Sequence, residues 1–252
     1  MTTFMNKHLV YIVSISDPTA KVDHSLYSKY CIESWKYWCK KHSIDLHVVT
    51  ESDPRCGKPI WNKELVYEYA QGYEKIALVD ADTMIKWNAP NFFDLFEEDF
   101  CMVHDDSNWS WVYKSMQNYS KFFNTSMTMD DYGNAGVLFF HKKYLDICEK
   151  VFKLYSDNKQ ELDDWNKGGG REQTIFNYML KENNVSPKWL SSKWNLISMH
   201  KRELFKHNFQ LGDNIPHFIK HGYIWHFTGF GIEDRANIVK QTWDLIKDNY
   251  ND

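Results

Sequence analysis

Residues 76–82 read Ile-Ala-Leu-Val-Asp-Ala-Asp, an apolar run that ends in two carboxylates, Asp80 and Asp82. In an extended segment the side chains of residues i and i+2 point to the same side. We therefore expect a buried strand that presents both carboxylates at its carboxyl end, where open α/β sheets bind their ligands. Mg²⁺ and Mn²⁺ commonly bind one or two carboxylates together with substrate phosphates. The stretch predicts a metal and diphosphate site, although Asp-x-Asp can also form a turn or cap a helix.

Strands and helices are expected to alternate on the amino-terminal side of this stretch. The pattern predicts a strand at 8–16, a helix within 24–42, a strand at 44–48, a helix at 62–71 and then the strand that ends at Asp80. A β-α-β-α-β order implies a parallel sheet with right-handed crossovers. The fold class is therefore α/β.

The rest of the chain continues this organisation less regularly. We expect a helix at 88–96, a strand at 100–104 and a loop-rich region at 105–131. A strand at 136–141 and a helix at 142–156 should follow, and then a glycine-rich loop at 168–170 that opens a helix at 171–181. The stretch at 184–225 is expected to be irregular, and a helix at 232–247 should close the chain. We find no internal repeat and no linker, so the 252 residues are predicted to form one domain over 1–252.

The composition excludes several function classes. The net charge is −4, and the 30 Lys and Arg residues are scattered, which argues against a nucleic-acid or anionic-membrane partner. Five dispersed cysteines fit a reducing compartment. No signal-peptide pattern or membrane-length apolar run is present in the sequence, so we expect a soluble cytoplasmic protein. Aromatic residues are frequent and suit stacking on sugars or bases, although most will belong to the core.

Several separated segments together resemble the GT-A glycosyltransferases, most closely the retaining enzymes of glycosyltransferase family 8, such as glycogenin and the bacterial lipopolysaccharide galactosyltransferases. The segments are Ser14-Ile15-Ser16-Asp17, Lys63, Asp80-Ala81-Asp82, Asn134-Ala135-Gly136-Val137, Glu172-Gln173, Trp194-Asn195 and His226-Phe227-Thr228-Gly229. The resemblance spans roughly residues 8–232 in the expected order. It implies a GT-A, Rossmann-like fold with a mixed central sheet flanked by helices.

The resemblance also implies a metal and nucleotide site. Asp80, Ala81 and Asp82 would bind the metal and the donor diphosphate. The third protein ligand would be His226, whose imidazole nitrogen suits Mn²⁺ better than Mg²⁺. Taken alone, a histidine is more often a surface or core residue. Lys63 would contact the diphosphate and the sugar, the alternative being an exposed helix lysine.

The first strand and the last motif would complete the donor site. Ile15, Ser16 and Asp17 would hold the base and ribose, unless they form only a capped turn. Gly229 would belong to the donor site as part of the last motif. Family members usually carry a lysine a few residues later, but this chain has Ile232 there, so Arg235 would have to supply the missing charge.

Two further segments would hold the donor sugar. The family's counterpart of Asn134, Ala135 and Gly136 contacts that sugar. Glu172 and Gln173 match an acidic residue–Gln pair beside the anomeric carbon, where the usual acid is Asp. The resemblance implies transfer with retention of configuration. Because neither residue resembles a committed covalent nucleophile, we expect this transfer to be front-face.

The expected activity is transfer of a hexose from a nucleoside-diphosphate sugar, with UDP as the expected nucleotide, to a carbohydrate or other hydroxyl acceptor. One alternative is a haloacid dehalogenase-like phosphatase, whose Asp-x-Asp-x-Thr/Val motif differs here by Met84 and normally follows an early first strand. The other alternative is a non-catalytic sugar-binding module, which gives no reason for these motifs to occur in series.

Overall fold

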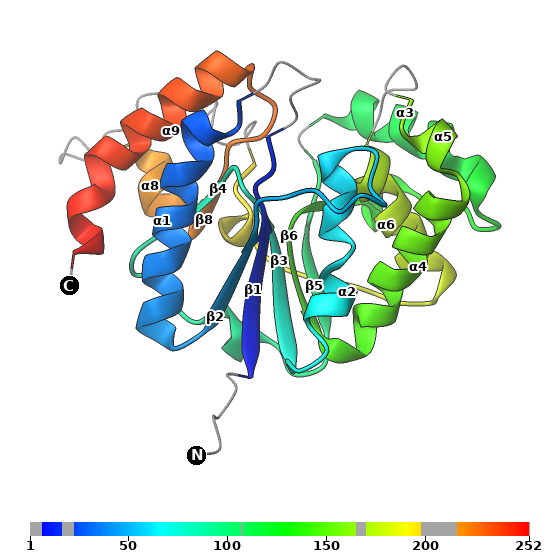
Figure 1. Ribbon diagram of the computed structural model, residues 1–252, viewed down its shortest axis with the longest axis horizontal. Helices are drawn as coiled ribbons and strands as arrows, with labels where there is room; N and C mark the ends of the chain where they lie inside the picture. The colour runs from blue at the N-terminus through cyan, green and yellow to red at the C-terminus, as the bar shows by residue number, and fades with distance from the viewer. Residues whose placement is uncertain (1–6, 17–22, 107, 165–169, 198–215, 252) are drawn as a thin grey trace.

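The main sheet of the protein is mixed. The computed structural model describes residues 7–16, 23–106, 108–164, 170–197 and 216–251. Its larger sheet contains β1 (His8–Val13), β2 (Asp45–Val49), β3 (Lys75–Asp80), β5 (Phe100–His104), β6 (Gly133–His141) and β7 (Lys188–Trp189), in the order β2-β1-β3-β6-β5-β7 (Figure 1). Strand β6 runs antiparallel to β3 and β5, whereas the β1–β2, β1–β3 and β5–β7 pairs are parallel. The parallel arrangement predicted for the first three strands is correct, and so is the mixed sheet.

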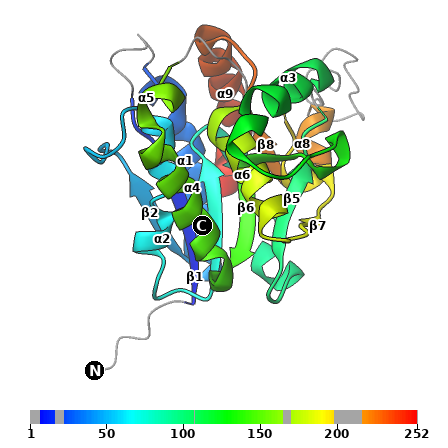
Figure 2. The same cartoon turned by 90° about the vertical axis from the view of Figure 1, so that its right-hand side faces the viewer.

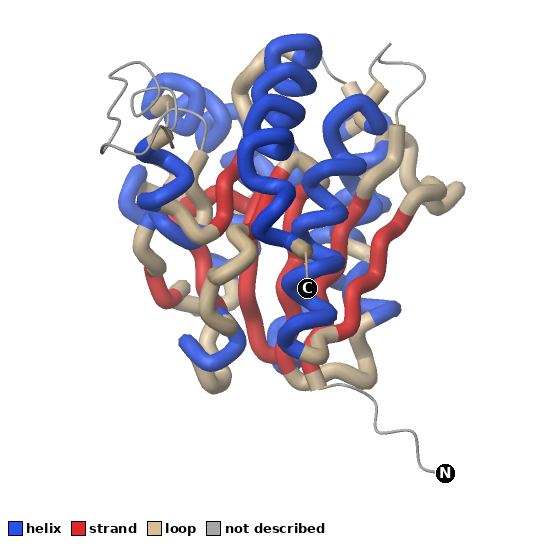
Figure 3. The backbone as a smooth tube through the Cα atoms, turned by 90° about the vertical axis from the view of Figure 1, so that its left-hand side faces the viewer, coloured by secondary structure: helices blue, strands red, loops and turns tan. Residues whose placement is uncertain are grey.

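Helices cover both faces of this sheet. They are α1 (Ser25–His42), α2 (Val66–Tyr69), α3 (Trp109–Tyr119), α4 (Leu145–Asp157), α5 (Lys159–Leu162), α6 (Arg171–Glu182), α8 (His217–His221) and α9 (Ile232–Ile246). Helices α1 and α9 lie on one side, which faces the viewer in Figure 3, and α2, α4 and α6 lie on the other, which faces the viewer in Figure 2. A second, two-stranded antiparallel sheet pairs β4 (Thr83–Ile85) with β8 (Ile224–His226).

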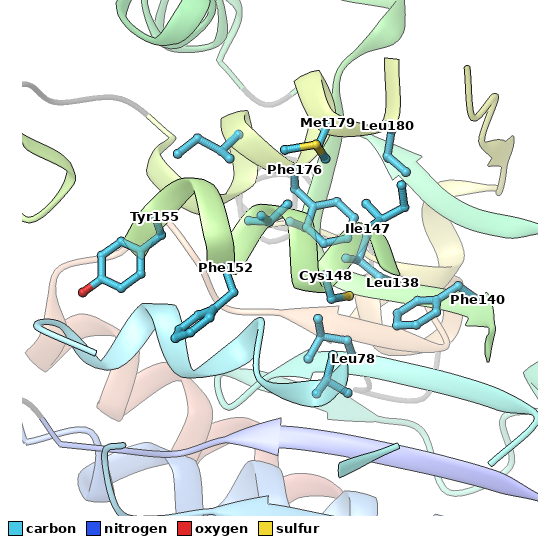
Figure 4. Packing of buried hydrophobic residues seen from close by; sticks show 14 of the residues in the cluster. Leu78, Leu138, Phe140, Ile147, Cys148, Phe152, Tyr155, Phe176, Met179 and Leu180 are labelled. Atoms are coloured by element: carbon cyan, nitrogen blue, oxygen red, sulfur yellow. The ribbon is translucent and has the colours of Figure 1, made fainter. Parts of the chain in front are cut away.

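The central strands are buried on both faces, as their continuous apolar sequences predict. Because side chains alternate along a strand, Leu78 of β3 points into the core under α4 and α6, while Val79 points into the core under α1. Figure 4 shows the first core, where side chains from β3 and β6 pack against those of α4 and α6. The second core contains Trp35 and Trp38 of α1, which are both fully buried.

Two predicted helices are much shorter than expected. In place of a helix at 62–71, the chain forms a 3₁₀ turn at Pro59–Lys63 and one helical turn, α2. All residues from 61 to 66 are buried, so this segment lacks the exposed face of an amphipathic helix. In place of a helix at 88–96, the chain forms a 3₁₀ turn at Phe92–Leu95 capped by Asn91. The backbone is extended at Asn91 and again at Phe96, which limits the helical turn to the four residues between them.

Two stretches are more ordered than predicted. Region 105–131 contains α3, whose side-chain cap Asn108 and buried residues Val112, Ser115, Met116 and Tyr119 have helical spacing that sequence reasoning overlooked. The described parts of 184–225 contain β7, α8 and the start of β8. The predicted strand at 8–16 ends at Val13. Of the helices in the described ranges, none has the length and apolar content that a membrane span requires.

Candidate active site

Three potential metal ligands meet at the carboxyl end of β3. Asp80 is the last residue of β3, Ala81 and Asp82 form a turn, and β4 starts at Thr83. His226 ends β8, where it pairs with Thr83, so antiparallel pairing brings the imidazole beside the turn. One ligand atom from each of Asp80, Asp82 and His226 lies within 4.8 Å of the other two. The expected extended conformation is wrong, because a turn and not a strand brings the two carboxylates together.

The carboxylates each divide their two oxygens between the imidazole and a cation. His226 Nε2 lies 3.3 Å from Asp82 Oδ1 and 3.7 Å from Asp80 Oδ2. The other oxygens form ion pairs, Asp80 Oδ1 with Lys63 Nζ at 2.7 Å and Asp82 Oδ2 with Arg235 Nη1 at 3.0 Å. Burial alone would raise the pKa of Asp82, but the charges of His226 and Arg235 outweigh burial and hold the pKa well below its usual range. Two carboxylate oxygens and one imidazole nitrogen form a donor set that fits Mn²⁺, with Mg²⁺ as an alternative.

Lys63 is a buried cation and not an exposed helix lysine, because only 4% of its surface is exposed. Its Nζ donates a hydrogen bond to the Ala135 carbonyl at 3.0 Å and lies 3.9 Å from Glu172 Oε1. Burial by itself lowers the pKa of Lys63, but Asp80 and Glu172 outweigh burial and raise the pKa above its ordinary value. Lys63 therefore stays charged and connects β3, β6 and the start of α6.

Glu172 and Gln173 enter the site from the first turn of α6. Gln173 Oε1 accepts a hydrogen bond from the Ala135 backbone N–H at 3.0 Å, which ties α6 to β6. Burial, which outweighs the attraction of Lys63, raises the pKa of Glu172 to about 7. The predicted glycine-rich opening of this helix is Gly170, its N-cap, while Gly168 and Gly169 lie outside the described residues.

Gly136 lets the β6 backbone lie directly against the ligands. A Cβ at this position would overlap His226 and would lie 2.9 Å from Asp80 Oδ2. The buried Asn134 side chain accepts a hydrogen bond at its Oδ1 from the Gly136 backbone N–H at 2.9 Å, so this backbone donor has a partner within the same strand. The predicted Asn134-Ala135-Gly136 segment is therefore brought to the same place as the ligands.

The predicted nucleotide residues are only partly described. Val13 pairs with Asp80 across β1 and β3, and the chain continues from there to Ile15, which is buried, and Ser16, which is exposed. Asp17 lies outside the described residues. Gly229, which follows β8, adopts a φ of 74°, where a residue with a Cβ would be strained.

Arg235, in the first turn of α9, reaches the site as expected, whereas Ile232 packs against a hydrophobic core. Besides its ion pair with Asp82, the guanidinium donates to Tyr27 Oη at 3.1 Å and lies over the Tyr27 ring. Burial by itself lowers the pKa of Arg235, but Asp82 and Tyr27 outweigh burial and raise it. Arg235 is therefore a partly buried cation beside the ligands.

Two side chains of the site, Asp105 and Glu64, were missed by sequence reasoning, and a third, Asn195, was named only as part of the Trp194-Asn195 segment without a role. Asp105 accepts hydrogen bonds from both Asn134 and Gln173, and Asn195 bonds to His226. Glu64, next to Lys63, is 1% exposed, and burial raises its pKa to about 8. Asp105 could have been found, because it directly follows the strand at 100–104, just as Asp80 ends its own strand. The sequence around Glu64 carries no comparable signal.

Comparisons with known proteins show that the chain has a known fold. No family model matches the chain, and no curated protein matches it. A glycosyltransferase involved in glycosylation of the major capsid of PBCV-1 is 16% identical, with a TM-score of 0.58 over 92% of this chain and 99% of the other. The galactosyltransferase LgtC, solved with donor and acceptor sugar analogues, is 13% identical, with a TM-score of 0.51 over 92% of this chain and 95% of the other. The chain therefore has the GT-A glycosyltransferase fold.

Proposed function

We propose that this chain is a single-domain, metal-dependent glycosyltransferase that moves a hexose from a UDP-sugar to an acceptor hydroxyl with retention of configuration. The observation that carries the proposal is the meeting of Asp80, Asp82 and His226 at the end of a central strand, on a fold shared with glycosyltransferases. These three residues would hold the metal, Mn²⁺ in preference to Mg²⁺. When bound, the metal would withdraw charge from the departing nucleoside diphosphate and fix its orientation.

The cations of the chain itself support departure of the diphosphate. Lys63 and Arg235 already lie against the outer oxygens of Asp80 and Asp82, so a diphosphate beside those carboxylates would lie within reach of both cations. A buried cation stabilises developing negative charge more strongly than an exposed one, because the surroundings have a lower dielectric constant. In this proposal Arg235 takes the role of the lysine that Ile232 replaces.

The side chains around the expected sugar position favour front-face attack. Gln173 is uncharged, and its amide is already hydrogen-bonded to Ala135 and Asp105. Glu172 lies beside Lys63, where burial favours its protonated form, so it is a poor nucleophile. We therefore propose that the acceptor oxygen bonds to the anomeric carbon as the bond to phosphate breaks, and that its proton passes to a leaving phosphate oxygen. Glu172 and Gln173 orient the sugar.

Calorimetry of UDP binding tests this proposal. We expect UDP to bind in MnCl₂, more weakly in MgCl₂, and at least tenfold more weakly in EDTA. Asp82→Ala should abolish the Mn²⁺-dependent component, because it removes a buried ligand oxygen, whereas Asp94→Ala, at an exposed carboxylate, should change nothing. Metal-independent UDP binding, or a folded Asp82→Ala variant with parental affinity, would refute the metal site.

Turnover of a nucleotide sugar separates the alternatives. A glycosyltransferase releases UDP from a UDP-sugar in the presence of Mn²⁺ and an acceptor, and slowly with water in place of an acceptor. A phosphatase would release inorganic phosphate from phosphomonoesters, and a sugar-binding module would release neither. Phosphate release without UDP release would overturn the proposed reaction while leaving the fold unchanged.

A further inference from the structure

A continuous row of buried polar side chains runs behind the candidate metal ligands. The row starts at His226, whose Nδ1 lies 3.0 Å from Asn195 Oδ1. Asn195 Nδ2 donates to Asn134 Oδ1 at 2.8 Å, and Asn134 Nδ2 donates to Asp105 Oδ2 at 3.0 Å. The same Asp105 oxygen accepts a second hydrogen bond from Gln173 Nε2 at 2.9 Å. All five side chains are buried. The row connects β8, the loop at 195, β6, the end of β5 and α6, which are far apart in sequence.

The direction of these hydrogen bonds is imposed at two independent points. A carboxylate only accepts, so Asp105 requires Asn134 to present its Nδ2 group. The Gly136 backbone N–H only donates, so it requires Asn134 to present Oδ1 on the other side. Both requirements give the same orientation of the Asn134 amide. Gln173 is oriented in the same way, by Asp105 at Nε2 and by the Ala135 N–H at Oε1.

This direction determines which nitrogen of His226 carries a proton. Because Asn134 offers Oδ1, Asn195 must turn its Nδ2 toward Asn134 and its Oδ1 toward the imidazole. Asn195 Oδ1 only accepts, so Nδ1 of His226 must be the donor. Nε2 is then the nitrogen that faces the oxygens of Asp80 and Asp82, and its lone pair is the one that a metal bound there would use. Histidines that bind metals generally donate their second N–H to such an acceptor.

We propose that Asn195 is a positioning residue of the metal site: its amide, oriented by Asn134 and Asp105, holds the proton of His226 on Nδ1 and leaves Nε2 for the metal. This inference rests on the metal site of the proposed function and assigns a role to residues that do not touch the metal. The same Asp105 carboxylate orients Gln173, so one anchor sets both the metal ligand and a sugar-side residue.

Substitutions at Asn195 distinguish hydrogen bonding from packing. Asn195→Leu keeps the branching of the side chain but removes the acceptor, and we expect the Mn²⁺ dissociation constant to rise tenfold or more, the range usual for partners of metal-binding histidines. Asn195→Asp keeps an acceptor for Nδ1, so Mn²⁺ affinity should stay within about threefold. A purely structural Asn195 would show the reverse order, because a buried leucine is tolerated better than a buried carboxylate. Mn²⁺ binding is measured without substrate by electron paramagnetic resonance of the free ion.

The matched control is Asn177→Leu. Asn177 is a buried amide on α6 that bonds to both backbone groups of Gly133 and donates to the Gln173 backbone carbonyl, so its hydrogen bonds go to backbone atoms and not to the side chains of the row. This variant should lose folding stability and keep the parental Mn²⁺ affinity. Equal losses of affinity in Asn177→Leu and Asn195→Leu would overturn the proposal, as would parental affinity in Asn195→Leu.

A measurement on the unsubstituted protein does not depend on whether the variants fold. In metal-free protein labelled with ¹⁵N-histidine, long-range ¹H–¹⁵N correlation spectra report which ring nitrogen carries a proton, and His226→Gln identifies the signal. We expect the neutral imidazole to carry its single proton on Nδ1. An unprotonated Nδ1 would overturn the role of Asn195 alone, whereas a parent that binds no Mn²⁺ would overturn the metal dependence of the proposed function.

Discussion

Glu64 allows a quantitative test of the electrostatics beneath the site. Its carboxyl group is buried beside Lys63, and within the described residues Oε2 finds no hydrogen-bond partner. Lys63 is already neutralised by Asp80, so ionising Glu64 would add an uncompensated buried charge. Burial therefore raises its pKa from 4.5 to about 8. Replacing it by glutamine removes the titration and keeps the shape of the side chain.

The direction of the pH effect follows from proton counting. Between pH 4.5 and about 8, the folded protein holds a proton on Glu64 that the unfolded chain releases, so stability falls as pH rises through this window. At 1.36 kcal/mol per pKa unit, the shift from 4.5 to about 8 corresponds to about 5 kcal/mol over the whole titration, of which about 3.5 kcal/mol is lost between pH 5 and pH 8. Glu64→Gln should lack this loss, and it should be more stable than the parent by an amount that grows with pH.

Urea unfolding of both proteins at pH 5, 6, 7 and 8 measures this difference, because all other titrating groups are shared. Glu149→Gln, at an exposed glutamate of α4, is the control and should follow the parent at every pH. Mn²⁺ binding should survive in Glu64→Gln, since the Lys63–Asp80 ion pair is unchanged. Parent and Glu64→Gln stabilities that stay parallel from pH 5 to pH 8 would refute the reasoning.

Three further predictions concern the site itself. His226→Ala should raise the Mn²⁺ concentration for half-maximal donor hydrolysis by tenfold or more, because one of three protein ligands is lost; an unchanged value would make His226 structural. Arg235→Met should weaken UDP binding about tenfold, because a cation beside the diphosphate is lost. It should also raise the pKa of Asp82, which would be seen as a higher pH for half-maximal Mn²⁺ binding. An unchanged UDP affinity would remove Arg235 from the diphosphate site. Glu172→Gln should slow turnover, and intact mass spectrometry should detect no sugar covalently attached to the enzyme. Proton NMR of the first product should show an α linkage. A β linkage would refute retention, and a sugar attached to Glu172 in the parent would refute front-face attack.

The order of the first elements could be predicted because each carries its own local signal. The run before Asp80 is continuously apolar, which predicts a strand buried on both faces. The buried residues Tyr27, Cys31, Trp35 and Trp38 of α1 recur at helical spacing. Helix α3 also had such a signal, in its Asn108 cap and buried stripe, and was missed because polar and aromatic residues surround it. The helix expected at 62–71 did not form because residues 61–66 are all buried, and the helix expected at 88–96 is reduced to one turn by extended backbone at Asn91 and Phe96.

The sequence by itself determined that an α/β sheet would form and that Asp80 and Asp82 would lie at the carboxyl end of one of its strands. Both features follow from local properties of the chain, namely the alternation of apolar strands with helices and the Asp-x-Asp pair. Only the tertiary structure decided that β6 runs antiparallel, that Lys63 and Glu64 are buried together, and that pairing of β4 with β8 brings His226 to the turn at Asp82. The reason is physical: periodicity reports which face of an element is buried, but not which distant element covers it. The hydrogen bonds from Asp105 to His226 need three such long-range placements at once, so no local pattern could encode them.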